Sequence, residues 1–412
     1  MKVTFQWIFV VSFSLLFGLN AYAQSTINDF LLTAFEDRNT QEYSRKLDFL
    51  SKKNYQLPFG EELELRYSND ERTLDDARYQ VRFRPTNPWK IRRNNALFNA
   101  LKEEISLAQS IEFKENLSNR YSLMLDYIFA VQKTEIISKK LELTKRKIQF
   151  FEQFTQSDLF DAQDYVEAKL ESIEVLDDYD DQLVTANQAM KEIQFILQSN
   201  KVEWRDFTLA SVDIVEQIFG EVVQSSFSSV ELDYLTQQVE VARLETYTEK
   251  ADFDLGFVQA EYAPNLDNGK NELGFSFGFT IPIFKNNKDQ LAERILDEIE
   301  NENELEVEQF KDSLNKALEF SFLSDYIIHH RLLVDEIAKL DLEKLSVDLA
   351  QSEDFDPITL LELEEGKLKL DELVLRSHQR LMEHYLDFLF AFDALTDLPL
   401  RNYFANDLKQ IE

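Results

Sequence analysis

The chain has 412 residues, and its 77 Asp and Glu residues outnumber its 44 Lys and Arg residues, which gives a formal net charge of −33 at pH 7. A protein this acidic would repel a polyanion, so a nucleic acid partner is not expected. Hydrophobic residues make up 44% of the chain and include 34 Phe, which argues against intrinsic disorder, and the absence of cysteine excludes disulfides, thiolate metal sites and lipid attachment through cysteine.

The N-terminus has the pattern of an export signal. Lys2 precedes an apolar run over residues 7–19, and Ala21-Tyr22-Ala23 offers a small-x-small cleavage site. As a helix this run would be roughly 20 Å long, which is short of the roughly 30 Å hydrocarbon core that a membrane anchor must cross. We therefore predict a signal peptide at 1–23 and an exported mature chain that begins with a helical segment at 24–60.

The mature sequence contains one pattern twice, with the second copy about 195 residues after the first. Each copy has an alternating strand pair, a proline at its exit, and a long helix that turns and runs back. The two turn sequences are similar, QSDLFD at 156–161 and QSEDFD at 351–356. This duplication predicts that a strand pair and a helical hairpin are built twice in one chain.

The first copy is predicted to hold a strand pair at 61–88 and a helical hairpin at 89–200. In the strands, apolar residues alternate with polar ones: Leu63, Leu65, Tyr67, Tyr79, Val81 and Phe83 against Glu64, Arg66, Arg78, Gln80, Arg82 and Arg84. Residues 89–154 contain neither Pro nor Gly and would form a helical rod of roughly 100 Å, followed by a return helix at 162–198. A coiled coil is indicated by the heptad spacing of Leu117, Tyr121, Met124, Ile128 and Val131, and then of Ile137, Leu141, Thr144, Ile148 and Phe151.

The second copy follows a mixed region with a helix at 201–251. Its strand pair is predicted at 252–284, where Leu273, Phe275, Phe277, Phe279 and Ile281 alternate with Gly274, Ser276, Gly278 and Thr280. The other strand, 253–262, is less regular, as a bulge would make it. Its hairpin is predicted at 285–398, with one helix over 288–349, a turn at 352–356 and Pro357 in the first turn of the return helix. Leu361, Leu368, Leu375 and Met382 repeat at sevens, and a tail at 399–412 ends the chain.

The strand pairs distinguish membrane from soluble interpretations. Four strands of about ten residues suit a transmembrane barrel, but four strands cannot close one. An open sheet edge is not tolerated in lipid, so the chain would share its barrel with other copies, and three copies would supply twelve strands. The alternative is an ordinary half-buried sheet, whose strands alternate in the same way.

In order and spacing, four segments resemble the TolC-type outer-membrane efflux protein family over essentially the whole mature chain. FSFGFTIPIFKNNKDQLAERILDEIE is similar to the family's strand, Pro-x-Phe and helix entry, and its counterpart here is VRFRPTNPWKIRRNNALFNALKEE, in which Pro88 corresponds to Pro282. SSVELDYLTQQVEVARLETYTEKADFDLGF resembles the helix that leads into the third barrel strand, and DPITLLELEEGKLKLDELVL resembles the family's return helix.

This resemblance implies an α+β membrane protein, internally duplicated: a homotrimer with a twelve-stranded β-barrel, four strands per chain, in the outer membrane of a Gram-negative bacterium. An α-helical coiled-coil tunnel would continue it through the periplasm, with an equatorial belt from the region between the copies and the C-terminal tail. Such proteins are passive exit ducts of tripartite efflux or type I secretion systems. They dock to a periplasmic adaptor and an inner-membrane pump, and they need no cofactor.

Three groups of candidate residues follow. The exposed hairpin turns lack the family's glycine and are candidates for adaptor docking, with mere closure of the turns as the alternative role: Ser157, Asp158, Leu159, Phe160, Ser352, Glu353, Asp354 and Phe355. For the periplasmic aperture, Glu362 and Glu365 are three residues apart on one helix face, and threefold symmetry would repeat them as carboxylate rings that favour cations. The resemblance adds Asp356 by position; solvated helix surface is the alternative for all three. Alternation places Arg78, Arg82 and Arg84 in the barrel lumen, which they would make partly basic.

Enzyme chemistry has little support in the sequence. His378 and His384 are six residues apart rather than the four that would bring them together on a helix face, so no metal site is predicted. The chain has no Gly-rich phosphate loop, nucleophile elbow or cysteine nucleophile. The serious alternative to a channel is a periplasmic coiled-coil scaffold or adaptor without a pore, whose β-domain would be soluble.

Overall fold

The computed structural model describes residues 26–52, 57–69, 77–155, 161–200, 202, 204, 207–225, 227–251, 255–265, 270–279, 288–351, 357–397, 399–408 and 410–411. The predicted signal peptide at 1–23 lies outside these residues. The chain divides into two compact units, which are described separately. The helical-hairpin unit comprises Met1–Asp37, Glu115–Ser226 and Ala317–Glu412, and the sheet unit comprises Arg38–Lys114 and Phe227–Lys316. No helix in the described part of the chain has the length and apolar character needed to cross a membrane.

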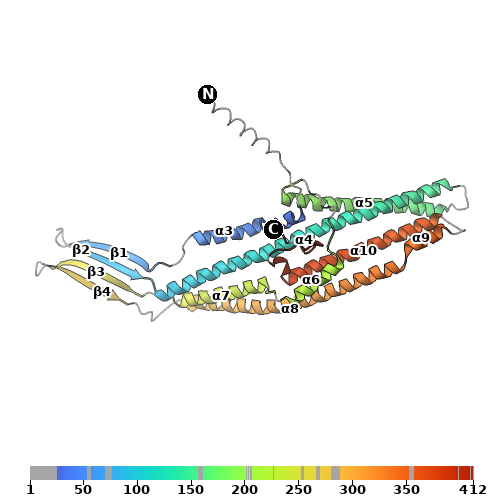
Figure 1. Ribbon diagram of the computed structural model, residues 1–412. Coiled ribbons are helices and arrows are strands. Elements are labelled where there is room, and N and C mark those ends of the chain that lie inside the picture. Colours follow the sequence, from blue (N-terminus) through green and yellow to red (C-terminus); the bar gives the residue numbers. More distant parts are fainter. Residues whose placement is uncertain are drawn as a thin grey trace, which may run out of the picture. The chain divides into compact units, whose positions relative to one another are not determined.

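The elements follow the predicted duplication (Figure 1). In chain order they are α2 (Ile27–Leu32), α3 (Arg38–Lys52), β1 (Gly60–Asn69), β2 (Ala77–Pro85), α4 (Pro88–Gln153), α5 (Ala162–Leu197), α6 (Val212–Gln224), α7 (Val230–Lys250), β3 (Phe257–Asn265), β4 (Lys270–Gly278), α8 (Lys288–Lys339), α9 (Leu342–Ala350), α10 (Pro357–Ala391) and the 3₁₀ helix η2 (Ala394–Thr396).

The sheet unit contains one antiparallel sheet in the order β1-β2-β3-β4 (Figure 1). Strand β2 of the first copy pairs with β3 of the second, so that Tyr79 lies opposite Tyr262 and Val81 opposite Ala260. The two predicted strand pairs therefore form one continuous sheet whose outer strands are β1 and β4.

The irregularity in this sheet is not where the sequence predicted it. Strand β3 keeps an unbroken register with both β2 and β4, so the bulge expected within 253–262 is absent from its described residues. The register shift lies instead in β1, between Gly60 and Glu62. Gly60 suits this position because a Cβ there would lie 2.4 Å from the Phe83 ring of the neighbouring strand.

Helix α4 confirms the long Pro- and Gly-free rod of the first hairpin. Its 66 residues span roughly 100 Å. Pro88 occupies the first turn, where its missing N–H leaves no hydrogen bond unmade, and Asn87 Oδ1 caps the helix by accepting from the Trp89 N–H at 3.0 Å. The return helix α5 begins at an N-cap, Asp161, which accepts from the Gln163 N–H at 2.7 Å.

The second hairpin differs from the prediction of one helix over 288–349, which was wrong. Helix α8 ends at Lys339, and α9 begins at Leu342. Asp341 causes the break: it adopts a left-handed backbone with φ 43°, and its carboxylate accepts from the Lys344 N–H at 3.4 Å as the N-cap of α9. Without Pro or Gly, this break carries no strong sequence signal. Helix α10 begins at Pro357 as predicted.

The core of the helical-hairpin unit forms where α4, α10 and the C-terminal segment meet. Tyr121, Tyr385 and Phe404 are fully buried, with ring centroids 5.0 Å apart for Tyr121 and Phe404 and 5.2 Å apart for Tyr385 and Phe404. The backbone N–H of Ala210, from the region between the copies, donates to the Phe404 carbonyl at 2.9 Å. The region between the copies and the C-terminal tail thus pack together.

Candidate functional site

One face of the sheet is apolar and open to the surroundings. Three rows of paired side chains cross all four strands on this face, and Leu65 and Phe277 are 73% and 67% exposed. The residues of this apolar face are Leu63, Leu65, Tyr67, Tyr79, Val81, Val258, Tyr262, Leu273, Phe275 and Phe277. Water hydrates such a face poorly, and it has the composition of a surface that contacts lipid or a protein partner.

The opposite face is polar and carries the predicted lumen arginines. Arg82 donates two hydrogen bonds to Gln259 Oε1, at 2.9 and 3.1 Å, and lies 3.7 Å from the Glu64 carboxylate. Arg84 pairs with Glu62 at 3.1 Å, and Arg78 lies opposite Ser68 in the register. Because Arg82 and Arg84 each have a glutamate beside them, this face carries less net positive charge than the arginines alone suggest.

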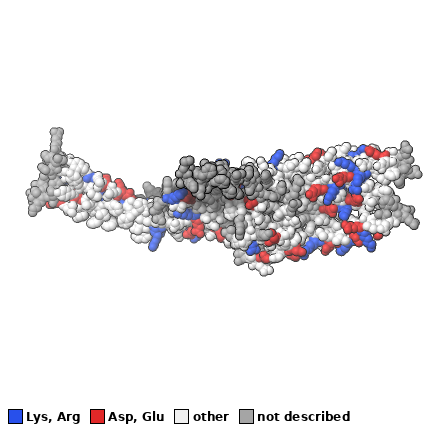
Figure 2. All heavy atoms as spheres, turned by 45° about the horizontal axis from the view of Figure 1, so that its top comes forward, with Lys and Arg blue, Asp and Glu red and all other residues white. Residues whose placement is uncertain are grey.

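In the helical-hairpin unit, ion pairs join α4 of the first hairpin to α10 of the second. Lys140 pairs with Glu372, Arg146 with Glu364 at 2.6 Å, and Lys147 with Glu365. Lys140 and Lys147 are seven residues apart on α4, as are Glu365 and Glu372 on α10, so the pairs follow the heptad repeat of two antiparallel helices. Figure 2 shows basic and acidic side chains interspersed over this part of the surface.

Glu362 and Glu365, which are three residues apart on α10, border the same pocket of about 250 Å³. Helices α4, α5 and α10 line this acidic pocket with Lys147, Phe150, Phe151, Asp164, Glu167, Ala168, Glu171, Ile358, Leu361, Glu362 and Glu365. Five of its lining residues are carboxylates, against one lysine. Such an excess of negative charge attracts cations.

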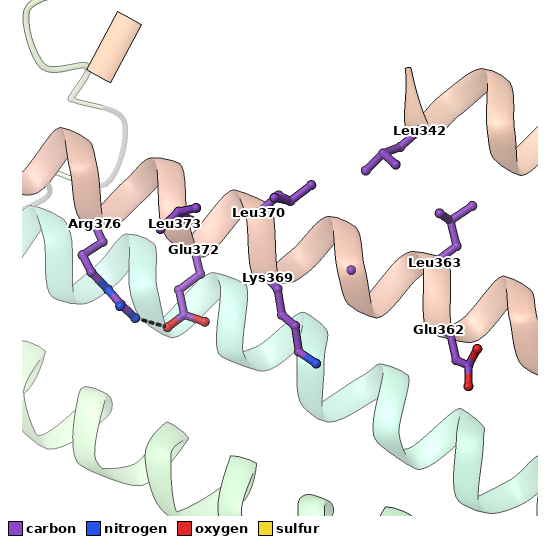
Figure 3. Close-up of a pocket in the computed structure, with 9 residues that line it drawn as sticks. Leu342, Glu362, Leu363, Lys369, Leu370, Glu372, Leu373 and Arg376 are labelled. Atoms are coloured by element: carbon purple, nitrogen blue, oxygen red, sulfur yellow. Dashed lines mark hydrogen bonds and ion pairs between the residues drawn. The ribbon is translucent and has the colours of Figure 1, made fainter. Parts of the chain in front are cut away.

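The two predicted aperture glutamates differ in their surroundings. Burial alone would raise the pKa of Glu365, but hydrogen bonds from Lys147 and Lys369 outweigh it and hold that pKa below its usual value. Glu365 is therefore ionised and compensated by two ammonium groups. Glu362 is exposed, and Figure 3 shows its carboxylate on the α4 side of α10 together with Lys369 and Glu372. Glu362 is thus the more accessible of the two carboxylates.

A groove of about 620 Å³ runs along α10, and Glu362, Lys369 and Glu372 line it together with apolar side chains (Figure 3). Leu342 at the start of α9 and the α10 residues Leu363, Leu370 and Leu373 provide its apolar wall. The remaining predicted site residues lie outside the described residues: Asp356 and the turn residues Ser157, Asp158, Leu159, Phe160, Ser352, Glu353, Asp354 and Phe355.

The histidines were judged in the sequence only by their spacing along one helix, which misses contacts between helices. His330 of α8 and His378 of α10 have ring centroids 5.6 Å apart, and His330 Nδ1 lies 3.1 Å from Ser377 Oγ. Burial, and to a lesser degree the neighbouring His330, lowers the pKa of His378 to about 4. A second interhelical group, formed by Glu319 of α8 with His384 and Asp387 of α10, was likewise not predicted.

Comparison with known proteins identifies the fold. No family model matches the sequence, and neither does any curated protein. Among solved structures, the open state of the Neisseria gonorrhoeae MtrE outer membrane channel matches with a TM-score of 0.64 and 12% identity, covering 89% of this chain and 88% of that one. The outer membrane protein VceC of Vibrio cholerae gives 0.62 and 12% over 89% and 95%, and the Campylobacter jejuni CmeC outer membrane channel gives 0.60 and 10% over 89% and 85%.

These matches confirm the predicted fold class at the level of the single chain. Long helices and a four-stranded antiparallel sheet, arranged as in the TolC-type outer-membrane channels, extend over about 89% of the sequence. At 10–12% identity the likeness establishes the fold alone. A function must be argued from the residues on the surfaces of this chain.

Proposed function

We propose that this chain is one subunit of a homotrimeric outer-membrane channel. The trimer acts as the passive exit duct of a tripartite efflux or type I secretion system, its helices lie in the periplasm, and it performs no chemistry of its own. The observation that carries this proposal is the exposed apolar face of a sheet with two outer strands, in a chain with the fold of outer-membrane channels.

The sheet supports both the membrane location and the assembly. In lipid, the outward backbone groups of β1 and β4 would have no water to bond, so each outer strand requires a strand from another copy. Three chains of four strands close a ring of twelve, with the apolar face toward lipid and the face of Arg82 and Glu64 toward the water-filled interior.

Apolar stripes on two helices support the same assembly in the periplasm. On α5, Val166, Leu170 and Ile173 are 54%, 56% and 66% exposed and follow a helical spacing of four and three residues. On α8, Val307, Phe310 and Leu314 are also exposed and spaced by three and four residues. A coiled-coil surface of this kind is normally covered, and neighbouring copies of the chain would cover it.

The partners are a periplasmic adaptor and an inner-membrane pump, which supplies the energy for transport. The hairpin turns at 157–160 and 352–355 remain predicted docking sites for the adaptor. The carboxylates of Glu362, Glu365 and Asp356 remain candidates for the aperture, and the acidic pocket that contains the first two is consistent with selection for cations.

A periplasmic scaffold or adaptor without a pore is the alternative function. It would account for the export signal and the long helices equally well. It does not account for the apolar face of the sheet, because a soluble β-domain normally exposes only polar side chains or small apolar patches. The membrane assignment therefore depends on this face.

A matched pair of substitutions in β4 tests the proposal. Phe275→Arg puts a charge on the apolar face and should cost about 2–4 kcal/mol per chain near the bilayer midplane. Gly274→Arg puts the same charge on the polar face, opposite Glu261, where the nearest atom to a new Cβ is 3.9 Å away. We expect Phe275→Arg to abolish the heat-modifiable trimer in outer-membrane fractions and its conductance in planar bilayers, while Gly274→Arg keeps both. Full recovery of the wild-type protein in the soluble periplasm would refute the proposal.

A further inference from the structure

Helices α8 and α10 bring together a set of side chains suited to a metal ion. Among the described residues, one group of three His, Asp and Glu side chains places its potential ligand atoms within 4.8 Å of one another: Glu319 of α8 with His384 and Asp387 of α10. The distance from His384 Nδ1 is 3.9 Å to Glu319 Oε2 and 4.0 Å to Asp387 Oδ2.

Two of these atoms are buried and lack a hydrogen-bond partner. Within the described part of the chain, neither Glu319 Oε2 nor His384 Nδ1 makes a hydrogen bond, although both are shielded from solvent. They face each other at 3.9 Å, which is too far for a hydrogen bond. Leaving buried polar atoms unsatisfied costs about 1–3 kcal/mol each, so an arrangement of this kind calls for an occupant.

Charge indicates what that occupant is. The carboxylates of Glu319 and Asp387 have oxygens within 4.8 Å of each other beside the His384 ring, so two like charges lie close together where Glu319 Oε2 is shielded from solvent. A divalent cation between the three side chains would remove this repulsion and satisfy both buried atoms.

The donor set and its support select among cations. Calcium and magnesium prefer all-oxygen sites, whereas one imidazole nitrogen with two carboxylate oxygens suits a first-row transition ion. The His384 ring stacks on Tyr326 with centroids 4.3 Å apart, which restricts its orientation. In a tetrahedral zinc site the ligand atoms would be about 3.3 Å apart, so an inward movement of about half an ångström per side chain completes the geometry.

We propose that Glu319, His384 and Asp387 form a divalent transition-metal site of the Zn²⁺ type that links α8 to α10. The exposed side of the site, at Asp387, leaves one coordination position for water. The site lies in the second helical hairpin, and its existence does not depend on whether the chain forms a channel. Metal binding would stabilise the packing of two helices whose ligands are 65 residues apart, Glu319 and His384.

The test measures metal binding to the purified full-length mature protein in detergent after treatment with EDTA. Calorimetric titration with Zn²⁺ should give one high-affinity site per chain, and Co²⁺ should give visible d–d absorption bands. His384→Gln and Glu319→Gln should each weaken Zn²⁺ binding at least tenfold and remove the Co²⁺ bands. His329→Gln, which changes an exposed histidine of the same helix α8, should leave both unchanged.

Circular dichroism of each variant verifies that it is folded, and Glu319→Gln provides the result if His384→Gln does not fold. The proposal is overturned if the wild-type protein binds no Zn²⁺ or Co²⁺. It is equally overturned if a folded His384→Gln or Glu319→Gln variant binds Zn²⁺ as tightly as the wild type. Failure of the channel proposal would show instead as loss of the trimer or conductance, which these measurements do not use.

Discussion

Acidification should destabilise the helical-hairpin unit through His378. This side chain packs against the Phe129 ring at a centroid distance of 5.7 Å and near His330, and burial lowers its pKa to about 4. In the unfolded chain its pKa would be about 6.5. The folded state therefore favours the neutral imidazole, and the stability that this provides is complete above pH 6.5 and is lost as the pH falls from 6.5 toward 4.

The pKa difference sets the size of the effect. A shift from 6.5 to about 4 corresponds to roughly 3 kcal/mol of unfolding free energy per chain, most of which is lost by pH 4.5. His330, whose pKa is also lowered mainly by burial, acts in the same direction. A carboxylate close to the His378 ring would raise the pKa of His378 and so oppose the effect of burial. Glu135 and Asp371 line the adjoining pocket, but neither contributes noticeably to this pKa.

Urea unfolding of the detergent-solubilised protein at pH 8 and pH 4.5, followed by circular dichroism, measures the effect. Other groups also titrate between pH 8 and pH 4.5, so the wild type must be compared with His378→Gln, whose residue 378 cannot ionise. The informative quantity is the loss of unfolding free energy on acidification in the wild type minus the same loss in the variant. We expect a difference of about 2 kcal/mol or more. The exposed His329→Gln variant should lose as much as the wild type. If His378→Gln loses as much stability as the wild type, burial of a neutral His378 is not the cause and the reasoning is wrong.

Three further predictions concern the sheet and the acidic pocket. Gly256→Ala should prevent correct sheet assembly, because Gly256 has φ +98° and a Cβ there would lie 1.9 Å from a carbonyl oxygen of β4. Gly366→Ala should be tolerated, because no atom lies within 4 Å of a new Cβ at that position. The outer-membrane yield of the trimer measures the effect of both substitutions. Glu362→Gln should reduce cation selectivity in planar bilayers more than Glu365→Gln, because two lysines already compensate Glu365, and equal reductions would contradict this. Lys147→Met should raise the pKa of Glu365 and destabilise the packing of α4 on α10 by roughly 1–3 kcal/mol. The effect should appear as a lower urea midpoint of unfolding and a larger single-channel conductance. An unchanged urea midpoint would contradict this prediction.

Much of the fold can be predicted from local patterns in the sequence. The absence of Pro and Gly over 89–154 predicts α4 closely, because helix formation needs only uninterrupted propensity and a buried stripe. The alternation of apolar and polar residues predicts the strands and their two faces, because successive side chains of a strand point to opposite faces of the sheet. Asp161 and Pro357 mark the starts of α5 and α10 through ordinary capping and first-turn preferences.

The missed features depend on contacts between residues distant in the sequence. The glutamate beside Arg82 lies on a neighbouring strand, and only the register reveals it. The group around His384 needs Glu319 from another helix, so counting residues along one helix cannot find it. The break at Asp341 depends on a single left-handed residue, which aspartate tolerates without requiring it.

The charges of the two copies explain why α4 pairs with α10. The copies are offset by 195 residues, from Gln156 to Gln351, so Lys140 and Arg146 of α4 correspond to Asp335 and Asp341 of the second copy. The second copy thus carries the opposite charge at the positions that correspond to those meeting Glu372 and Glu364 on α10, with Asp335 in α8 and Asp341 in the break before α9. A second-copy segment placed in the position of α4 would set carboxylates against carboxylates. The charge pattern therefore favours the pairing of α4 with α10. It disfavours pairing α10 with the corresponding second-copy segment, which a duplicated sequence would otherwise permit.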